Sequence, residues 1–101
     1  MEITKFQKRV YELCKKVPEG KVTTYKILAE KLGTKAYRAV GAALNRNPFA
    51  PKVPCYRVVG SNGHLTGFAH GLKKKSEFLR KEGIIVRDFK IVDFNEVLFR
   101  F

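Results

Sequence analysis

Apolar side chains in the first part of the chain recur at the spacing of a helix, not at the alternation of a strand. The pattern predicts an amphipathic helix over residues 4–17, whose apolar face is made by Phe6, Val10, Leu13, Cys14 and Val17. A turn over residues 18–21, which holds a proline and a glycine, ends this helix. A short extended stretch at residues 22–23 follows it.

The next two helical patterns lie close together in the sequence. Thr24 is a suitable N-cap for a helix that continues to residue 32, and Gly33 suits the position just beyond its C-terminus. Thr34 is expected to cap a third helix over residues 35–44. A helix, a tight turn and a second helix together make the helix-turn-helix pattern.

A strand pattern replaces the helical one in the middle of the chain. Residues 45–54 contain three prolines and cannot be regular. Residues 56–59 are predicted to form a short strand, residues 60–63 a hairpin-type turn, and residues 64–66 the returning strand. This pair would form a small β wing.

The last third of the chain returns to helix and ends in a mixed tail. A loop at residues 67–71 has a glycine at each end, and residues 72–81 predict a fourth helix that ends near Gly83. In the tail, a strand is indicated by Ile85, Arg87 and Phe89, and a helical turn or two by Phe94, Val97, Leu98 and Phe101. The predicted fold class is mainly α with a small β wing, a winged helix-turn-helix-like single domain over residues 1–101.

Charge narrows the class of partner. Twenty-one Lys and Arg residues face nine Asp and Glu residues, which gives a net charge of +12 and indicates a polyanion such as nucleic acid. The competing interpretation, a basic membrane-surface protein, needs a long amphipathic helix that no segment provides. Two distant cysteines, no signal peptide and no run of transmembrane length predict a reducing intracellular setting. The two His and two Cys residues lack zinc-site spacing, so no metal is expected.

Small residues dominate the third predicted helix. Ala36, Ala39 and Gly41 would let its backbone approach a nucleic-acid groove closely, and Arg38 is the one long cationic side chain among them. The alternative is that the alanines are only good helix formers and that Arg38 is a solvated charge. The helix by itself leaves both interpretations open.

Cys55 stands at a boundary between loop and strand, between Pro54 and Tyr56-Arg57. A free cysteine is nucleophilic as a thiolate, and a neighbouring cation favours that form. The alternative is a buried, inert cysteine. We interpret Cys14 in that second way, because it lies on the apolar face of the first helix.

Four segments together resemble a known family. The segments 38–44, 47–48, 54–59 and 67–72 are similar, in order and spacing, to the C-terminal domain of O6-alkylguanine-DNA alkyltransferases. The resemblance covers roughly residues 3–83 and not the tail. It implies a winged-helix-type domain that holds duplex DNA from the minor groove, flips out the damaged guanine and passes its O6-alkyl group irreversibly to a cysteine. No metal and no cofactor are implied.

The resemblance also assigns roles. Cys55 would be the acceptor, Arg38 the side chain that fills the stack where the flipped base was, and Tyr25 the one that crowds the phosphate. Asn47 would brace the turn that carries the site, and Glu82 would be the acidic end of a proton relay. The DNA-binding residues that it implies are Thr24, Tyr25, Lys26, Ala36, Tyr37, Arg38, Ala39, Gly41, Arg57 and Ser61. The base pocket that it implies is lined by Tyr25, Leu44, Val58, Phe68, Ala69 and His70.

Three residues depart from the family pattern. Tyr56 stands where the family has histidine, and a phenol with a pKa of about 10 is a poorer proton acceptor than imidazole. Phe68 replaces a tyrosine, and His70 replaces a glycine and should narrow the pocket. His64 and His70 are interpreted as loop histidines, with His70 left open as a substitute proton carrier. The run at residues 73–75 is interpreted as a solvated helix start, with a phosphate site as the alternative.

Three functions therefore compete. The first is repair of O6-alkylguanine, chiefly O6-methylguanine, by single-turnover transfer to Cys55. The second is a non-catalytic sensor of the same lesion, in which Tyr56 fails to activate the thiol; in such one-domain relatives the cysteine is typically replaced. The third is a plain helix-turn-helix DNA binder. We expect a monomer without the family's usual N-terminal domain and without a membrane partner, in the cytoplasm of a prokaryote or in a nucleus.

Overall fold

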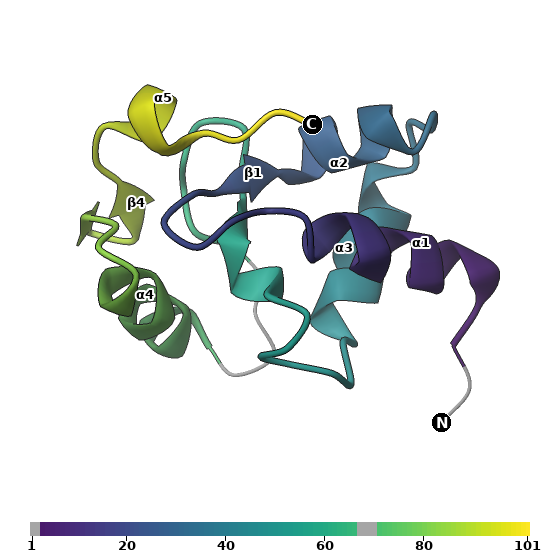
Figure 1. The fold of residues 1–101 in the computed structure, drawn as a ribbon. Helices are drawn as coiled ribbons and strands as arrows, with labels where there is room; N and C mark the ends of the chain where they lie inside the picture. Colours follow the sequence, from purple (N-terminus) through teal and green to yellow (C-terminus); the bar gives the residue numbers. More distant parts are fainter. Residues whose placement is uncertain (1–2, 67–70) are drawn as a thin grey trace.

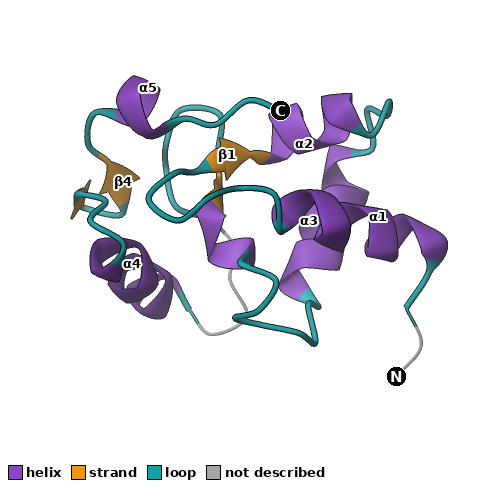
Figure 2. Ribbon diagram, viewed as in Figure 1, coloured by secondary structure: helices purple, strands orange, loops and turns teal. Residues whose placement is uncertain are grey.

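A computed structural model describes residues 3–66 and 71–101 of the chain (Figures 1 and 2). The helices are α1 Lys5–Cys14, α2 Tyr25–Lys31, α3 Tyr37–Asn45, α4 Leu72–Lys81 and α5 Phe94–Val97, with a 3-10 turn, η1, at Cys55–Arg57. The strands are β1 Thr23–Thr24, β2 Val58–Val59, β3 Val86–Arg87 and β4 Lys90–Ile91. Figure 1 shows α1, α2 and α3 at one end of the molecule, and α4 with β4 at the other.

Local sequence signals account for most of the helices. Thr4 and Gln7 form a capping box at the start of α1, and the Thr24 hydroxyl accepts from the backbone N–H of Ile27 at the start of α2. The fourth helix has the predicted bounds. The third starts two residues later than predicted, because the Thr34 hydroxyl accepts from the backbone N–H of Ala36 and so closes a turn before the helix.

The predicted hairpin between residues 56–59 and 64–66 is wrong. Only Val58–Val59 is a strand there, and it pairs in parallel with β1, Thr23 opposite Val58 and Thr24 opposite Val59. Both valines are fully buried, so they need a partner inside the molecule, and the segment before α2 supplies it. The first residues of the predicted strand form η1 instead.

Residues 64–66 were predicted to pair with the strand at residues 56–59. They pair with the C-terminal tail instead. Strands β3 and β4 form an antiparallel hairpin, with Val86 opposite Ile91. His64 bridges to Lys90, and the backbone N–H of Leu65 donates to Phe89 at 2.8 Å. The turn at residues 60–63 is present as predicted, since the N–H of Gly63 donates to the Gly60 carbonyl at 2.8 Å. The β structure around residues 64–66 therefore depends on the tail.

Two buried clusters meet at η1. The first joins α1, α2 and α3 and includes Cys55 and Val58. The second lies under α4 and the β3–β4 hairpin and includes Tyr56 and Val59. Consecutive residues thus enter different clusters, which fixes the backbone at the candidate nucleophile. No helix within residues 3–66 and 71–101 is long and apolar enough to cross a membrane.

Candidate functional site

Cys55 opens η1 and is only 6% exposed. Its backbone N–H donates to the Val53 carbonyl at 2.8 Å, and the Asn47 side-chain amide donates to the same carbonyl at 2.8 Å. The Asn47 side-chain oxygen also accepts from the backbone N–H of Phe49 at 2.9 Å. Asn47 therefore spans the irregular loop before the cysteine and holds its two ends together.

The Glu82 carboxylate, at the C-cap of α4, accepts hydrogen bonds from the two residues that follow the cysteine. The Tyr56 hydroxyl donates to Oε2 at 2.6 Å. Arg57 donates from Nε to both carboxylate oxygens at 3.0 Å and from Nη2 to Oε2 at 2.7 Å. The backbone N–H of Gly20 donates to Oε1 at 3.0 Å. This hydrogen-bonded cluster of Tyr56, Arg57 and Glu82 ties η1 to α4 and to the turn after α1.

Tyr56 and Glu82 keep opposite protonation states in this cluster. Burial, together with the hydrogen bond and the negative charge of Glu82, raises the pKa of Tyr56 to about 12. Burial also acts to raise the pKa of Glu82, but the hydrogen bonds from Arg57, Tyr56 and Gly20 outweigh it and hold that pKa below its usual value. At neutral pH the phenol therefore stays protonated and the carboxylate stays ionised, so neither group readily takes a proton from a thiol.

Arg57 has an internal role in this structure, unlike the DNA contact that was predicted for it. Its side chain is 14% exposed, and its donors go to Glu82 and, from Nη1, to the Val17 carbonyl at 2.8 Å. A guanidinium held in this way is not presented to a phosphate.

The prediction that residues 73–75 form a solvated helix start is wrong for Lys75. Its side chain is fully buried, and Nζ donates to the Val58 carbonyl at 2.6 Å and to the Thr66 carbonyl at 2.7 Å. Burial lowers its pKa to about 8, although the negative charge of a Cys55 thiolate would act in the opposite direction. The sequence does indicate that Lys75 is buried. It lies three residues after Leu72 and four before Leu79, and this spacing puts it on the apolar face of α4.

Cys14 is the buried structural cysteine that was predicted. It is fully buried, and burial raises the pKa of its thiol to about 12. A thiol in that state is a poor nucleophile. Cys55 is therefore the better placed of the two free cysteines for chemistry.

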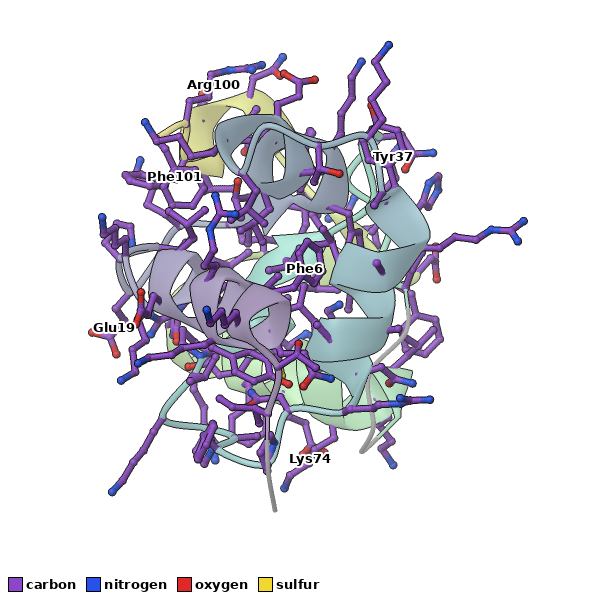
Figure 3. All side chains as sticks on the ribbon, turned by 90° about the vertical axis from the view of Figure 1, so that its right-hand side faces the viewer. Phe6, Glu19, Tyr37, Lys74, Arg100 and Phe101 are labelled. Carbon is purple, nitrogen blue, oxygen red and sulfur yellow. The ribbon has the colours of Figure 1, made fainter. Side chains whose placement is uncertain are left out.

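The predicted DNA-binding residues mostly share one face. An open groove of about 450 Å³ runs between the start of α2 and α3, and it is lined by Tyr25, Tyr37, Arg38, Gly41, Ala42, Asn45 and Thr66. A second hollow of about 320 Å³ adds Lys26 and Ser61 beside Tyr25 and Tyr37. Ala36 and Ala39 are exposed, and Figure 3 shows Tyr37 at the outer edge of the molecule.

The remaining predicted residues have other places. Thr24 is 3% exposed and caps α2, so its hydroxyl is occupied inside the molecule. Leu44 lies 4% exposed in the first buried cluster, and the carbonyl of the fully buried Val58 accepts from Lys75. The predictions for Phe68, Ala69 and His70 lie outside the described residues. In the parts that the structure describes, no group of three or more His, Cys, Asp or Glu residues could hold a metal ion.

These features define a small helix-turn-helix domain with a nearly buried cysteine in the cluster that joins its helices. The family model described as 6-O-methylguanine DNA methyltransferase, DNA binding domain, matches residues 5–84. The chain therefore belongs to this family, and the predicted fold class is confirmed.

Curated relatives cover most of this chain with about half of their own length. The methylated-DNA–protein-cysteine methyltransferase of Methanosarcina acetivorans is 52% identical over 83 residues, 81% of this chain and 53% of that protein. The protein of the same name from Shigella flexneri is 46% identical over 84 residues, 82% of this chain and 49% of that protein. This chain thus spans about half the length of the curated relatives that it matches.

Two solved structures of other proteins are similar to this chain. The Mycobacterium tuberculosis protein OGT in complex with DNA matches 80% of this chain and 51% of that chain, with a TM-score of 0.77 and 40% identity. The S. pombe protein Atl1, in complex with damaged DNA containing O6-carboxymethylguanine, matches 99% of both chains, with a TM-score of 0.82 and 25% identity. The tail beyond residue 84 therefore has a structural counterpart in Atl1 that lies outside the family model.

Proposed function

We propose that this chain repairs O6-alkylguanine, chiefly O6-methylguanine, in duplex DNA by transferring the alkyl group to Cys55. The observation that carries the proposal is the place of Cys55: it belongs to the buried cluster on which Tyr25 packs, and Tyr25 also lines the exposed groove beside Arg38. A base that enters through this groove would lie against Tyr25, which packs on the cluster that contains the cysteine. The curated names of the relatives support the same reaction.

The step balances without a cofactor. The Cys55 thiolate forms a bond to the alkyl carbon while the bond from that carbon to O6 breaks. The electron pair stays with the guanine, which takes up the proton that the Cys55 thiol gave up and remains in the duplex as the normal base. The thioether product is stable, so each molecule acts once. Arg38 and Tyr25 would assist extrusion of the base, which costs a few kcal/mol of unstacking.

A second candidate function, lesion sensing without transfer, is favoured by two observations. The end-to-end match is to Atl1, a protein solved with damaged DNA. The cluster beside Cys55 is also a poor proton acceptor, because Tyr56 has its pKa raised to about 12. Both candidates share the same DNA-binding face, so they differ only in the fate of the alkyl group.

Intact mass of the protein after incubation with a duplex that carries one O6-methylguanine separates these functions. Transfer predicts the gain of one methyl group, mapped to Cys55 and absent in Cys55→Ala. No gain, with the lesion duplex still bound more tightly than the undamaged one, points to the sensor. No gain and no preference for the lesion would leave only a general DNA-binding domain.

Replacing Arg38 by alanine is expected to weaken binding of the lesion duplex by about tenfold to a hundredfold, because nothing then fills the stack behind the flipped base. Arg38 is exposed on α3, so the fold should be kept. The measurement is fluorescence anisotropy with labelled lesion duplex. Arg46→Ala removes the same charge from the exposed C-cap of α3, outside the groove lining, and an equal loss in this control would contradict the proposed role.

Replacing Tyr56 by histidine is expected to raise the rate of methyl transfer by about tenfold to a hundredfold. An imidazole with a pKa of about 6.5 takes up a proton near neutral pH, whereas the Tyr56 phenol keeps its own. Single-turnover methyl uptake at pH 7.5 measures the effect. A rate that stays at the wild-type value would mean that proton acceptance at residue 56 does not limit transfer.

A further inference from the structure

The C-terminal segment is hydrogen-bonded to the residue just before β1, although the two lie far apart in the sequence. The Val22 N–H donates to the Val97 carbonyl at 2.9 Å, and the Phe99 N–H donates back to the Val22 carbonyl at 2.6 Å. A parallel bridge joins Val22 to Leu98. In Figure 1 this segment runs past β1 and ends beside α2. The backbone bonds on both sides of Leu98 therefore fix the position of the residues that follow.

The next residues alternate between the core and the surface. The rings of Phe99 and Phe101 meet edge to face with centroids 5.1 Å apart, and Phe101 packs against the first buried cluster. Side chains of an extended segment alternate between its two faces, so Arg100 projects away from both rings. Arg100 is exposed, and Figure 3 shows it on the same upper side of the molecule as Tyr37.

Arg100 lines a hollow that continues the proposed DNA-binding face. This hollow, of about 410 Å³, is lined by Thr24, Lys26, Ile27, Glu30, Ser61, Phe94, Asn95, Leu98 and Arg100. It shares Lys26 and Ser61 with the hollow that also holds Tyr25 and Tyr37. That hollow in turn shares Tyr25 and Tyr37 with the groove of Arg38. Shared lining residues thus make one continuous path from Arg38 to the tail.

The charges along this path suit a phosphate chain. Lys26 and Arg100 are cationic, and Glu30 is the one acidic residue in the lining of the terminal hollow. Neither cation takes part in an ion pair in the described part of the chain, where Arg57–Glu82 and Lys74–Glu77 are the pairs found. Both cations therefore remain available to an external anion.

We propose that Arg100 binds the phosphate backbone of the DNA duplex beside the lesion, so that the C-terminal segment extends the DNA-binding face beyond the helix-turn-helix. The proposal rests on the proposed function in taking duplex DNA as the partner. The neighbouring Lys26, Ser61 and Asn95 complete a polar lining for a backbone phosphate. Such a contact carries no base information, so it should serve damaged and undamaged DNA alike.

The test is the salt dependence of duplex binding by the full chain. Arg100→Ala should weaken binding of lesion and undamaged duplexes by the same factor, about three- to tenfold, and should lower the slope of log K against log salt by about one. Arg100→Lys should keep the wild-type slope, because a lysine also neutralises a phosphate. Arg87→Ala is the matched control: Arg87 is exposed in the same tail but lines a separate hollow with His64 and Lys90.

The possible results are distinct. An Arg100→Ala slope equal to that of wild type, or equal to that of Arg87→Ala, overturns the proposal. A loss confined to the lesion duplex also overturns it, because that would assign Arg100 to recognition of the base. If wild-type protein binds no duplex, the proposed function and the phosphate contact fail together, and this is seen before any variant is compared. Normal wild-type binding with an unaltered Arg100→Ala slope removes the phosphate contact alone.

Discussion

Replacing Glu82 by alanine is expected to lower the free energy of unfolding by about 3–5 kcal/mol. The carboxylate, 6% exposed, accepts from Tyr56, Arg57 and the backbone of Gly20. Its removal leaves the Arg57 guanidinium nearly buried and without its anion. Urea unfolding followed by circular dichroism measures the loss. A domain of this size has about 5–15 kcal/mol to lose, so the effect should be visible in the midpoint.

Glu77 provides the matched control on the same helix. Its ion pair with Lys74 has a distance of 3.5 Å between Nζ and Oε2, and the two side chains are 51% and 46% exposed. Solvent screens such a pair, so Glu77→Ala should change stability by less than about 0.5 kcal/mol. Similar losses for Glu82→Ala and Glu77→Ala would contradict a special role for the carboxylate at the helix end. Glu82→Gln keeps the shape and should fall between the two.

The Glu82 cluster also illustrates what sequence could and could not predict. The resemblance proposed Glu82 as the end of a relay, and the structure brings Glu82 within 2.6 Å of the Tyr56 hydroxyl. No local pattern, however, indicates that Arg57 turns inward to the same carboxylate, 25 residues further along the chain. An arginine in a basic chain fits a DNA contact equally well by sequence. Only the packing of α4 against η1 decides between the two.

Helices were predicted better than strands for a physical reason. The Thr24 cap and the pattern of α4 are encoded within a few residues, so the sequence reveals them. Strands here are two residues long, and their partners lie far away: β2 pairs with β1 across 35 residues. A Gly-containing turn at residues 60–63 suggested a hairpin, but the strand position after this turn, His64, bridges to Lys90 of the tail instead. The tail had no counterpart in the segments that carried the resemblance.

Replacing Lys75 by methionine is expected to keep the fold and to slow methyl transfer by at least about tenfold at pH 7.5. Methionine fills a similar volume, and relief of the desolvation cost of the buried charge offsets the loss of the hydrogen bonds to the Val58 and Thr66 carbonyls. The ammonium, however, interacts electrostatically with Cys55, and we expect its positive charge to assist a sulfur that attacks as an anion. Its loss should therefore reduce the rate more than the stability. Single-turnover methyl uptake, with urea unfolding in parallel, measures both.

The same substitution gives a pH test whose sign follows from the pKa of Lys75. In the native protein that pKa is lowered by burial from 10.5 to about 8. Between these values the unfolded chain holds the proton and the native protein does not, so raising the pH favours the native state. Wild-type stability should therefore rise relative to Lys75→Met by roughly 3 kcal/mol from pH 8 to pH 10.5. Below pH 8 Lys75 is charged in both states, and the difference should be constant.

Transfer should respond in the opposite direction over the same range. As Lys75 loses its proton above about pH 8, the cation that supports the Cys55 thiolate disappears. The rate advantage of wild type over Lys75→Met should therefore shrink while its relative stability grows. Tyr56, whose pKa is raised to about 12 by burial and by Glu82, is the same in both proteins and cancels in the comparison. A rate ratio that does not change with pH would mean that Lys75 supports transfer through its hydrogen bonds to Val58 and Thr66 and not through its charge.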